Sequence, residues 1–451
     1  MKTIAQISAE LQGYDPQALT CPDANLFLSK LVDPVTDNES VHLFDALGRV
    51  LAQDIISPIS VPPHDNSAMD GYAFDGAQLS AQAPLTLKVV GTALAGKAWR
   101  GTVAPGECVK IMTGAIMPGG LDTVVPQEFT RATSSMAEPQ ITIPAGLLQV
   151  GDNRRKLGED LLQGSPALQK GELLTPAALG LMASLGIEKA AVWRKLRVAY
   201  FSTGDEILSL GEAPREGAVF DSNRYTVFGL LKRLGCDVID MGVVRDEPEL
   251  LEAAFIKAAA QADAVITSGG VSVGEADHTK TMMKKLGDVA FWKIAMRPGR
   301  PMAVGRISGN QLASRSHEIC VDSYQNNSIS PIPHHAILFG LPGNPVAVMV
   351  TFLAFVRPAL LQMMGCKDGP PPLLKARSVE VIRKKPGRTE YQRGTVSMAP
   401  DGSLQVRTTG NQGSGVLSSM VQANGLIVLH HQQTSVNAGD EVDVMMFDGV
   451  I

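Results

Sequence analysis

Residues 262–280 read Ala-Asp-Ala-Val-Ile-Thr-Ser-Gly-Gly-Val-Ser-Val-Gly-Glu-Ala-Asp-His-Thr-Lys, and this stretch decides the fold. Its apolar start, residues 264–267, suits a strand buried in a parallel sheet, and a helical pattern resumes near Thr281. Between the two, glycines at the start of a helix favour backbone N–H groups that face an anion. The carboxylates that follow, Glu275 and Asp277, suit a divalent cation that bridges to phosphate. An ordinary strand-to-helix loop is the alternative for the same residues.

Strand and helix patterns alternate around this stretch over residues 193–366. The further apolar runs that suit strands are residues 196–201, 236–244, 289–296, 302–305 and 336–341. Such alternation predicts an open parallel sheet with right-handed crossovers. Ligands bind such sheets at the carboxyl ends of the strands, and the loops expected there are rich in Gly, Ser, Thr, Asp, Arg and Pro. We therefore predict a central α/β domain with a ligand site at that edge.

The rest of the chain reads as three further regions, so we predict a multidomain α/β protein. Residues 54–150 alternate in short strands, which predicts a β-rich domain. This domain is inserted into an N-terminal helical and linker domain that comprises residues 1–53 and 151–192. A proline-rich linker signal then introduces residues 367–451, where alternating short strands predict a small C-terminal β-barrel. The central parallel-sheet domain occupies residues 193–366.

The composition of the chain is that of a soluble globular protein. The chain has 451 residues, 45% of them hydrophobic and 19% charged, which is typical of soluble globular proteins. The net charge of −5 argues against non-specific nucleic-acid binding as the main activity. We find no run of about 18 apolar residues that predicts a membrane span, and no apolar signal core at the N-terminus. Five scattered cysteines without a CxxC pair predict free thiols in a reducing cytoplasm.

Several polar stretches leave alternatives open. Residues 65–70, Asp-Asn-Ser-Ala-Met-Asp, suit either an Asx-turn that leads into a strand or a set of ligands. Thr113 and the glycine after it suit a ligand or a tight turn. Residues 151–160 contain three consecutive cations, which favours a solvated charged loop. Residues 308–335 lack periodicity and predict a long surface loop.

Eight stretches, in this order along the chain, resemble the molybdopterin molybdenumtransferases, namely the bacterial MoeA proteins and the C-terminal part of gephyrin. They are Asp-Asn-Ser-Ala-Met-Asp-Gly-Tyr-Ala (65–73), Met-Thr-Gly-Ala (112–115), Ser-Thr-Gly-Asp-Glu (202–206), Asp-Ser-Asn-Arg (221–224), Thr-Ser-Gly-Gly-Val-Ser-Val-Gly-Glu-Ala-Asp (267–277), Met-Arg-Pro-Gly-Arg-Pro (296–301), Leu-Pro-Gly-Asn-Pro-Val (341–346) and Gly-Arg-Thr-Glu-Tyr-Gln-Arg-Gly (387–394). The resemblance covers essentially the whole chain.

This resemblance implies the last step of molybdenum cofactor synthesis. The expected substrates are adenylylated molybdopterin and molybdate, and Mg²⁺ is the expected cofactor. The reaction cleaves the pyrophosphate link, releases AMP and leaves molybdenum on the dithiolene. The resemblance also implies an elongated cytoplasmic homodimer whose cleft receives residues from both subunits. Molybdopterin adenylyltransferase and downstream cofactor-maturation proteins are the expected protein partners, without nucleic acid or membrane.

The resemblance also assigns residues by matching motifs. The catalytic candidates are Asp65, Thr113, Asp160, Glu206, Asp246 and Asp277, and the metal candidates among them are Glu206, Asp246 and Asp277. The substrate-binding candidates are Ser202, Thr203, Gly204, Ser268, Gly269, Gly270, Ser272, Gly274, Lys293, Arg297, Arg300, Pro342, Pro345, Arg393 and Ser414. The cations among them suit oxyanions, the glycines and serines suit phosphate, and the prolines set the shape of a loop. Metal and positional catalysis without a covalent protein intermediate is expected.

Two other functions compete with this one. A non-catalytic pterin scaffold or carrier is compatible with the gephyrin resemblance, although such a protein would not need the full acidic set. A molybdopterin adenylyltransferase would resemble residues 193–366 alone, and the additional N-terminal and C-terminal regions argue against it. Two departures from the family pattern stand out: the loop at 308–335 is long, and His64 precedes Asp65.

Overall fold

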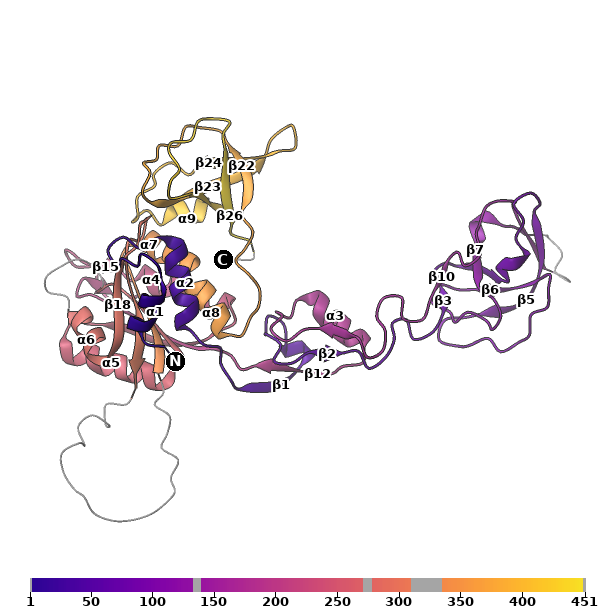
Figure 1. Ribbon diagram of the computed structural model, residues 1–451, viewed down its shortest axis with the longest axis horizontal. Coiled ribbons are helices and arrows are strands. Elements are labelled where there is room, and N and C mark those ends of the chain that lie inside the picture. The colour runs from indigo at the N-terminus through magenta and orange to yellow at the C-terminus, as the bar shows by residue number, and fades with distance from the viewer. Residues whose placement is uncertain (1, 133–138, 271–277, 310–334, 449–451) are drawn as a thin grey trace, which may run out of the picture. The chain divides into compact units, whose positions relative to one another are not determined.

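The computed structural model describes residues 2–132, 139–270, 278–309 and 335–448 (Figure 1). The chain forms two compact units. The first comprises Met1–Ala52, Gly171–Leu174 and Ala191–Ile451, and the second comprises Gln53–Lys170 and Thr175–Ala190. Each unit contains its own clusters of buried apolar side chains. The four domain boundaries expected from the sequence stay a prediction.

The first unit is built on a six-stranded sheet with the strand order β16-β13-β17-β21-β20-β18. Its strands are β13 Arg197–Thr203, β16 Asp237–Val244, β17 Ala264–Ser268, β18 Gly287–Lys293, β20 Pro301–Ser308 and β21 His335–Leu341. β16, β13, β17 and β21 run parallel, as the sequence predicts, whereas β20 is antiparallel to both of its neighbours. The chain between β18 and β20 is too short for a helical crossover, so these strands pair antiparallel.

Helices pack on both faces of this sheet. They are α4 Ser222–Arg233, α5 Pro248–Gln261, α6 His278–Leu286, α7 Pro345–Thr351, a π-helical segment Phe352–Val356 and α8 Arg357–Met363. Successive side chains of a strand point to opposite faces, so Val198 and Tyr200 of β13 share one core with α4, α7 and α8. Ala199 and Phe201 share the other core with α5 and α6. Burial on both faces explains why these strands read as continuous apolar runs.

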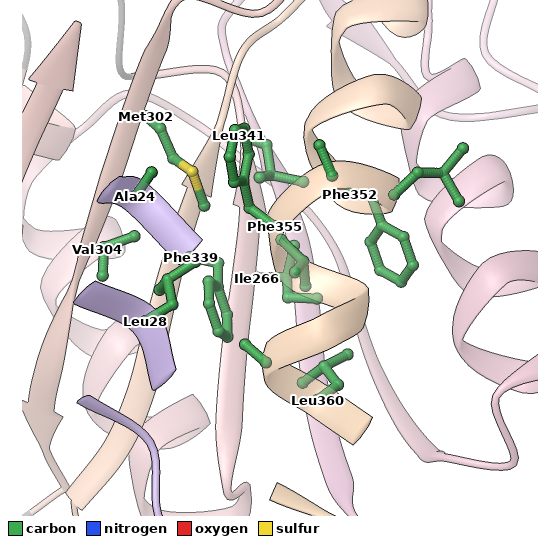
Figure 2. Packing of buried hydrophobic residues seen from close by; sticks show 14 of the residues in the cluster. Ala24, Leu28, Ile266, Met302, Val304, Phe339, Leu341, Phe352, Phe355 and Leu360 are labelled. Carbon is green, nitrogen blue, oxygen red and sulfur yellow. The ribbon is translucent and has the colours of Figure 1, made fainter. Parts of the chain in front are cut away.

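The N-terminal helices α1 Ile4–Glu10 and α2 Cys21–Leu31 add to the first of these cores. Figure 2 shows Ala24 and Leu28 of α2 beside Met302, Val304 and Phe339 of the sheet. The aromatic rings of Phe27 and Trp292 also meet edge to face, with centroids 5.0 Å apart. These helices therefore belong to the first unit, although their sequence predicts a helical domain of their own.

The segment Pro345–Met363 is a continuous helix of 19 residues, and its most apolar 18-residue window has a mean hydropathy of 1.8. Length and composition alone would allow it to cross a membrane, although the sequence has no apolar run that predicts a span there. Within the structure, however, 78% of its most apolar window is buried. Figure 2 shows Phe352, Phe355 and Leu360 of this helix in the core with Ile266. A buried core helix accounts for its composition.

The C-terminal strands close into a barrel, which confirms the predicted fold of this region. They are β22 Leu374–Ser378, β23 Thr389–Met398, β24 Leu404–Thr408, β25 Gly425–Leu429 and β26 Glu441–Met446. They pair in the order β23-β24-β22-β26-β25, and β25 pairs back onto β23. The short strand β19, Met296–Arg297, pairs in parallel with β23 and sets Arg297 opposite Glu390. The arginine loop of the α/β sheet is thereby attached to the barrel.

The second unit contains a six-stranded sheet with the order β7-β4-β6-β5-β9-β8. Its strands are β4 Gly71–Phe74, β5 Leu85–Ala93, β6 Glu107–Ile111, β7 Thr123–Pro126, β8 Arg131–Ala132 and β9 Gln140–Ile143. Apolar side chains are buried on both sides of the sheet, with Ala73 and Val109 in one cluster and Phe74 and Cys108 in the other. This unit also holds β2 Ile55–Ile56, β3 Asn66–Ser67, β10 Arg154–Arg155, β11 Pro166–Leu168 and α3 Pro176–Ser184. Further short elements of the chain are β1 Asn38–His42, β12 Lys189–Trp193, β14 Ile207–Leu208, β15 Val219–Phe220 and α9 Ser418–Gln422.

Candidate active site

A cleft of about 1060 Å³ lies in the first unit, at the carboxyl ends of β13, β16, β17 and β21. This is the edge at which parallel sheets bind ligands. The predicted site residues that line it are Ser202, Thr203, Gly204, Glu206, Asp246, Ser268, Gly269, Gly270, Arg297, Pro342, Pro345 and Ser414. They come from five loops of the α/β sheet and from one loop of the barrel. The fold thus brings together residues as far apart in the sequence as Ser202 and Ser414.

Three hydroxyl groups form a closed cluster beneath the cleft. Tyr200 Oη lies 2.9 Å from Ser202 Oγ and 2.6 Å from Ser268 Oγ, and the two serine oxygens are 3.2 Å apart. All three side chains are buried. Burial raises the pKa of the Tyr200 hydroxyl, so it stays protonated and can act as a donor. The cluster fixes the two serines at the ends of adjacent strands.

Two glycines allow the chain to fold tightly after β17. Gly269 has φ +89°, and a Cβ there would lie 2.4 Å from the carbonyl oxygen of Thr203. Gly270 has φ +65°, and a Cβ there would lie 2.5 Å from Cβ of the buried Thr279. Only glycine adopts both conformations without strain. The Gly269 N–H donates to the carbonyl of Leu341 at 3.2 Å, so it serves the fold, although the sequence suggests an amide that faces a ligand.

Two carboxylates among the expected metal ligands line the cleft, Glu206 and Asp246. The Glu206 carboxylate lies against Gly204, where a Cβ would come within 2.6 Å of Oε2. Thr279 Oγ1 donates to Asp246 Oδ1 at 3.3 Å, and the Asp246 N–H donates to Asp205 Oδ1 at 3.3 Å. Within the described part of the chain, no group of three or more His, Cys, Asp or Glu side chains is arranged to hold a metal ion. Mg²⁺ commonly takes only one or two protein carboxylates beside substrate phosphates, so these two donors fit it.

The predicted cationic residues differ in where they lie. Arg297 is exposed and lines the cleft, whereas Lys293 and Arg300 are outside its wall. Arg393 is fully buried, and its guanidinium donates to Ser419 Oγ at 2.9 Å and to the carbonyl of Gly413 at 2.9 Å. Burial, together with the nearby charge of Arg297, lowers the pKa of Arg393 to about 10. In this structure Arg393 supports the barrel loop that lines the cleft.

The loop after β21 joins the α/β sheet to that barrel loop. Asn344 precedes helix α7, and Pro345 occupies the first turn, where a missing N–H costs little. The Val346 N–H donates to the carbonyl of Ser414 at 3.1 Å. Pro342 lines the cleft in the same loop. The loop after β21 and the barrel loop therefore form one continuous part of the cleft wall.

Other residues of the wall are absent from the predicted set. They include Phe220, Asp221, Asn223, Gln412 and Gly413. Asp221 is the N-cap of α4, and its carboxylate accepts the Arg224 N–H at 3.0 Å. The sequence did carry a signal here, because residues 221–224 form one of the eight family-like stretches. The pattern Asp-Ser-Asn before a helix is also common in ordinary helix caps, so by itself it does not indicate a ligand site.

Three of the predicted catalytic residues lie in the second unit. Asp65 Oδ1 accepts the Leu157 N–H at 2.8 Å, and Asp65 Oδ2 lies 3.6 Å from Arg154 Nη1. The Thr113 backbone N–H and hydroxyl both donate to Asp70 Oδ1, at 2.6 and 2.8 Å. Asp160 donates its backbone N–H to the carbonyl of Val61. Their proposed part in catalysis stays a prediction.

Three predicted site residues, Ser272, Gly274 and Asp277, lie outside the described residues. The same holds for residues 310–334, which make up most of the expected long loop. The metal role of Asp277 and the effect of this loop on the cleft therefore stay predictions.

Comparisons with known families match the chain along most of its length. The family model described as MoeA N-terminal region (domain I and II) matches residues 19–186. The model described as probable molybdopterin binding domain matches residues 199–362, which include the cleft loops after β13, β16, β17 and β21. The model described as MoeA C-terminal region (domain IV) matches residues 375–447, which form the barrel.

Individual proteins match over similar lengths. A molybdopterin molybdenumtransferase of Haemophilus influenzae is 40% identical over 417 residues, covering 92% of this chain and 95% of that protein. One from a Nostoc species is 34% identical over 443 residues, covering 96% and 95%. The crystal structure of a molybdopterin biosynthesis moeA protein from Pyrococcus horikoshii superposes with a TM-score of 0.75 at 25% identity, covering 95% of this chain and 100% of that one. The resemblance, the fold class and the class of enzyme expected from the sequence are thereby confirmed, and the chain belongs to the molybdopterin molybdenumtransferase family.

Proposed function

We propose that this protein inserts molybdenum from molybdate into adenylylated molybdopterin, with Mg²⁺-dependent cleavage of the pyrophosphate link and release of AMP. The observation that carries the proposal is the composition of the cleft wall. It combines serine hydroxyls, the carboxylates of Glu206 and Asp246, and an exposed arginine at the carboxyl end of a parallel sheet. A pyrophosphate ester, a divalent cation and an oxyanion need these three kinds of group. The names of the relatives agree with this chemistry.

The carboxylates provide the cation site. Glu206 and Asp246 would hold Mg²⁺, together with the predicted ligand Asp277. When bound, Mg²⁺ neutralises the pyrophosphate charge and polarises the phosphorus. The hydrogen bond from Thr279 orients the Asp246 carboxylate before the cation arrives. Prior orientation matters because each ligand that is already in place reduces the entropy lost on binding.

The arginine provides the oxyanion site. The Arg297 guanidinium has a planar set of donors that matches molybdate or phosphate oxygens, and it lines the cleft. β19 pairs with β23 of the barrel and so fixes the backbone at Arg297. Arg393 acts indirectly, because its donors hold the barrel loop at residues 411–413. We propose that both arginines are needed for binding, one by contact and one by support.

The oligomeric state, the cellular location and the protein partners follow from the same function. We propose a cytoplasmic homodimer that receives adenylylated molybdopterin from the adenylyltransferase and passes the product to cofactor-maturation proteins. Size-exclusion chromatography with light scattering measures the mass of the protein in solution and so tests the homodimer. A mass near twice that of the chain is expected, and a monomer at all concentrations would contradict it.

The insertion reaction is tested by AMP release from purified protein. Adenylylated molybdopterin and Mg²⁺ are supplied with and without molybdate, and AMP is measured by chromatography. Release that depends on both Mg²⁺ and molybdate is expected. Tight binding without release would instead support a non-catalytic carrier. Consumption of ATP with non-adenylylated molybdopterin would support an adenylyltransferase.

A further inference from the structure

Besides the Thr203 hydroxyl, two atoms in the cleft wall that can only accept hydrogen bonds have no donor among the described residues. They are Asp221 Oδ2 and Asn223 Oδ1, both buried at the start of helix α4. Asp221 is 4% exposed and Asn223 is 8% exposed, yet both residues line the cleft. A buried carboxylate or amide oxygen without a donor costs free energy, so such atoms are rare unless a ligand satisfies them. The proposed reaction assigns neither atom a role.

The remaining polar atoms of these side chains are already used. Asp221 Oδ1 accepts the Arg224 N–H at 3.0 Å and so caps α4. Asn223 Nδ2 donates to the carbonyl of Gly343 at 2.7 Å, which fixes the amide with its oxygen on the other side. Both unpaired atoms can therefore only accept hydrogen bonds, and they belong to side chains two residues apart in the sequence. A ligand that satisfies them has to bring N–H or O–H donors.

An apolar aromatic surface lies next to these acceptors. Phe220 immediately precedes Asp221, lines the cleft and is 45% exposed. Its backbone is held by β15, which pairs with β14 and sets Phe220 opposite Leu208. An exposed aromatic ring at a cleft wall favours stacking with a flat ring of a ligand. Together, the wall suits a planar heterocycle that carries adjacent N–H donors.

We propose that Phe220, Asp221 and Asn223 form the subsite for the aminopyrimidinone ring of a pterin. A pterin presents an exocyclic amino group next to a ring N–H, and both are donors. Adenine presents its amino group between two ring acceptors, which a carboxylate would repel. The subsite therefore selects the pterin end of the substrate over its adenosine end. This inference rests on the proposed function, because it names the part of that substrate that the α4 wall binds.

The test compares two rings that differ at one position. The full chain is titrated, by ligand fluorescence, with 6-hydroxymethylpterin and with 6-hydroxymethyllumazine, in which an oxo group replaces the amino group. We expect the pterin to bind about tenfold more tightly or better, because the lumazine leaves a buried acceptor facing an oxygen. Equal affinities would overturn the proposal. AMP serves as a third ligand. If the variant Asp221→Asn loses affinity for AMP but keeps its affinity for the pterin, the proposal is likewise overturned.

Asp221→Asn is the decisive variant, since asparagine caps a helix as well as aspartate does. Its amide oxygen keeps the bond to Arg224, while its amide nitrogen turns the unpaired acceptor into a donor. We expect pterin affinity to fall about tenfold and the preference over lumazine to disappear. Retention of the preference would contradict the assignment. Asp240→Asn is the matched control, because Asp240 pairs with Arg224 outside the cleft wall. This variant should prefer pterin over lumazine as strongly as the wild type does.

A second variant keeps the proposal testable if Asp221→Asn does not fold. Phe220→Ala removes an exposed side chain, so we expect it to weaken both rings about equally and to preserve their ratio. Unchanged affinity for both rings would remove Phe220 from the subsite. The AMP-release assay separates this inference from the proposed function. If the protein prefers pterin over lumazine but shows no molybdate-dependent AMP release, the subsite is supported and the insertion reaction is refuted. If it releases AMP but shows no preference between the two rings, only the subsite is refuted.

Discussion

Two walls of the same cleft differ in how their polar groups are satisfied. In the strand-end wall, the side chains of Ser202, Ser268 and Asp246 each have a protein partner, and only the Thr203 hydroxyl is buried without one among the described residues. The helix wall, at the start of α4, contains Asp221 and Asn223, and each has a buried oxygen without a partner in the described part of the chain. Side chains that already have protein partners are held in place before any ligand arrives, as catalysis requires. An unsatisfied wall gains most when a ligand arrives, as recognition requires.

Asp246→Asn should have the largest effect, because it removes a charge from the strand-end wall. We expect AMP release to fall by about 10²- to 10³-fold, the usual loss for an electrostatic group at a reacting phosphate. Affinity for 6-hydroxymethylpterin should stay unchanged, since the helix wall is intact. Turnover is measured by AMP chromatography and affinity by fluorescence. A variant that turns over normally would remove Asp246 from the metal site.

Gly270→Ala should damage the strand-end wall through packing. The new Cβ would lie 2.5 Å from Thr279, at a positive φ that alanine disfavours. We expect a loss of about 1–3 kcal/mol in the free energy of unfolding, measured in urea. Gly229→Ala in α4 is the matched control, because none of the described residues places an atom within 4 Å of its added Cβ. That variant should be up to about 1 kcal/mol more stable than the wild type. Equal effects at both positions would contradict the tight contact.

Thr279→Val tests whether the hydrogen bond to Asp246 matters for turnover. The substitution keeps the shape of the side chain and removes the donor at 3.3 Å. We expect AMP release to fall about tenfold at low Mg²⁺ and to recover in part at high Mg²⁺, since misoriented ligands weaken metal binding. Thr279→Ser restores a hydroxyl and should restore activity. If serine and valine behave alike, the hydroxyl has no role.

Tyr200→Phe should have the smallest effect, about 1 kcal/mol of stability at pH 8. The variant leaves Ser202 and Ser268 with one hydroxyl partner fewer. Burial raises the pKa of Tyr200 above the ordinary tyrosine value of 10.0, so the hydroxyl ionises more readily in the unfolded chain. The stability that this group contributes is complete below that value and is lost as the pH rises above it. Urea unfolding at pH 8 and above pH 10 should therefore show that the difference in free energy of unfolding between the wild type and Tyr200→Phe becomes smaller at the higher pH. An advantage that grows with pH would contradict the assignment.

Much of the strand-end wall was predictable because its signals are local. An apolar run that ends in glycine and hydroxyl residues indicates a buried strand and the loop after it, so the loops at Ser202 and Ser268 were found. The closed barrel also follows from alternating short strands. The antiparallel β20 was not predicted, because the direction of a strand depends on its connections and not on its own residues.

The helix wall and the buried arginine could not be derived from pattern alone. Asp221 and Asn223 resemble an ordinary helix cap, and only the three-dimensional structure reveals that one oxygen of each lacks a donor from the residues that the structure describes. Arg393 has the charge expected of a phosphate ligand, yet tertiary packing buries it against carbonyl oxygens of the barrel loop. The position of α1 and α2 in the α/β core likewise depends on which apolar faces meet.

The most direct test of the central claim is a single-turnover measurement of AMP and of molybdenum together. Purified protein in excess over adenylylated molybdopterin is mixed with Mg²⁺ and molybdate, and both products are quantified in one sample. The account predicts that each AMP released is matched by one molybdenum atom bound to the pterin. AMP release without molybdenum incorporation would instead make the protein a hydrolase of the adenylylated pterin and contradict the account.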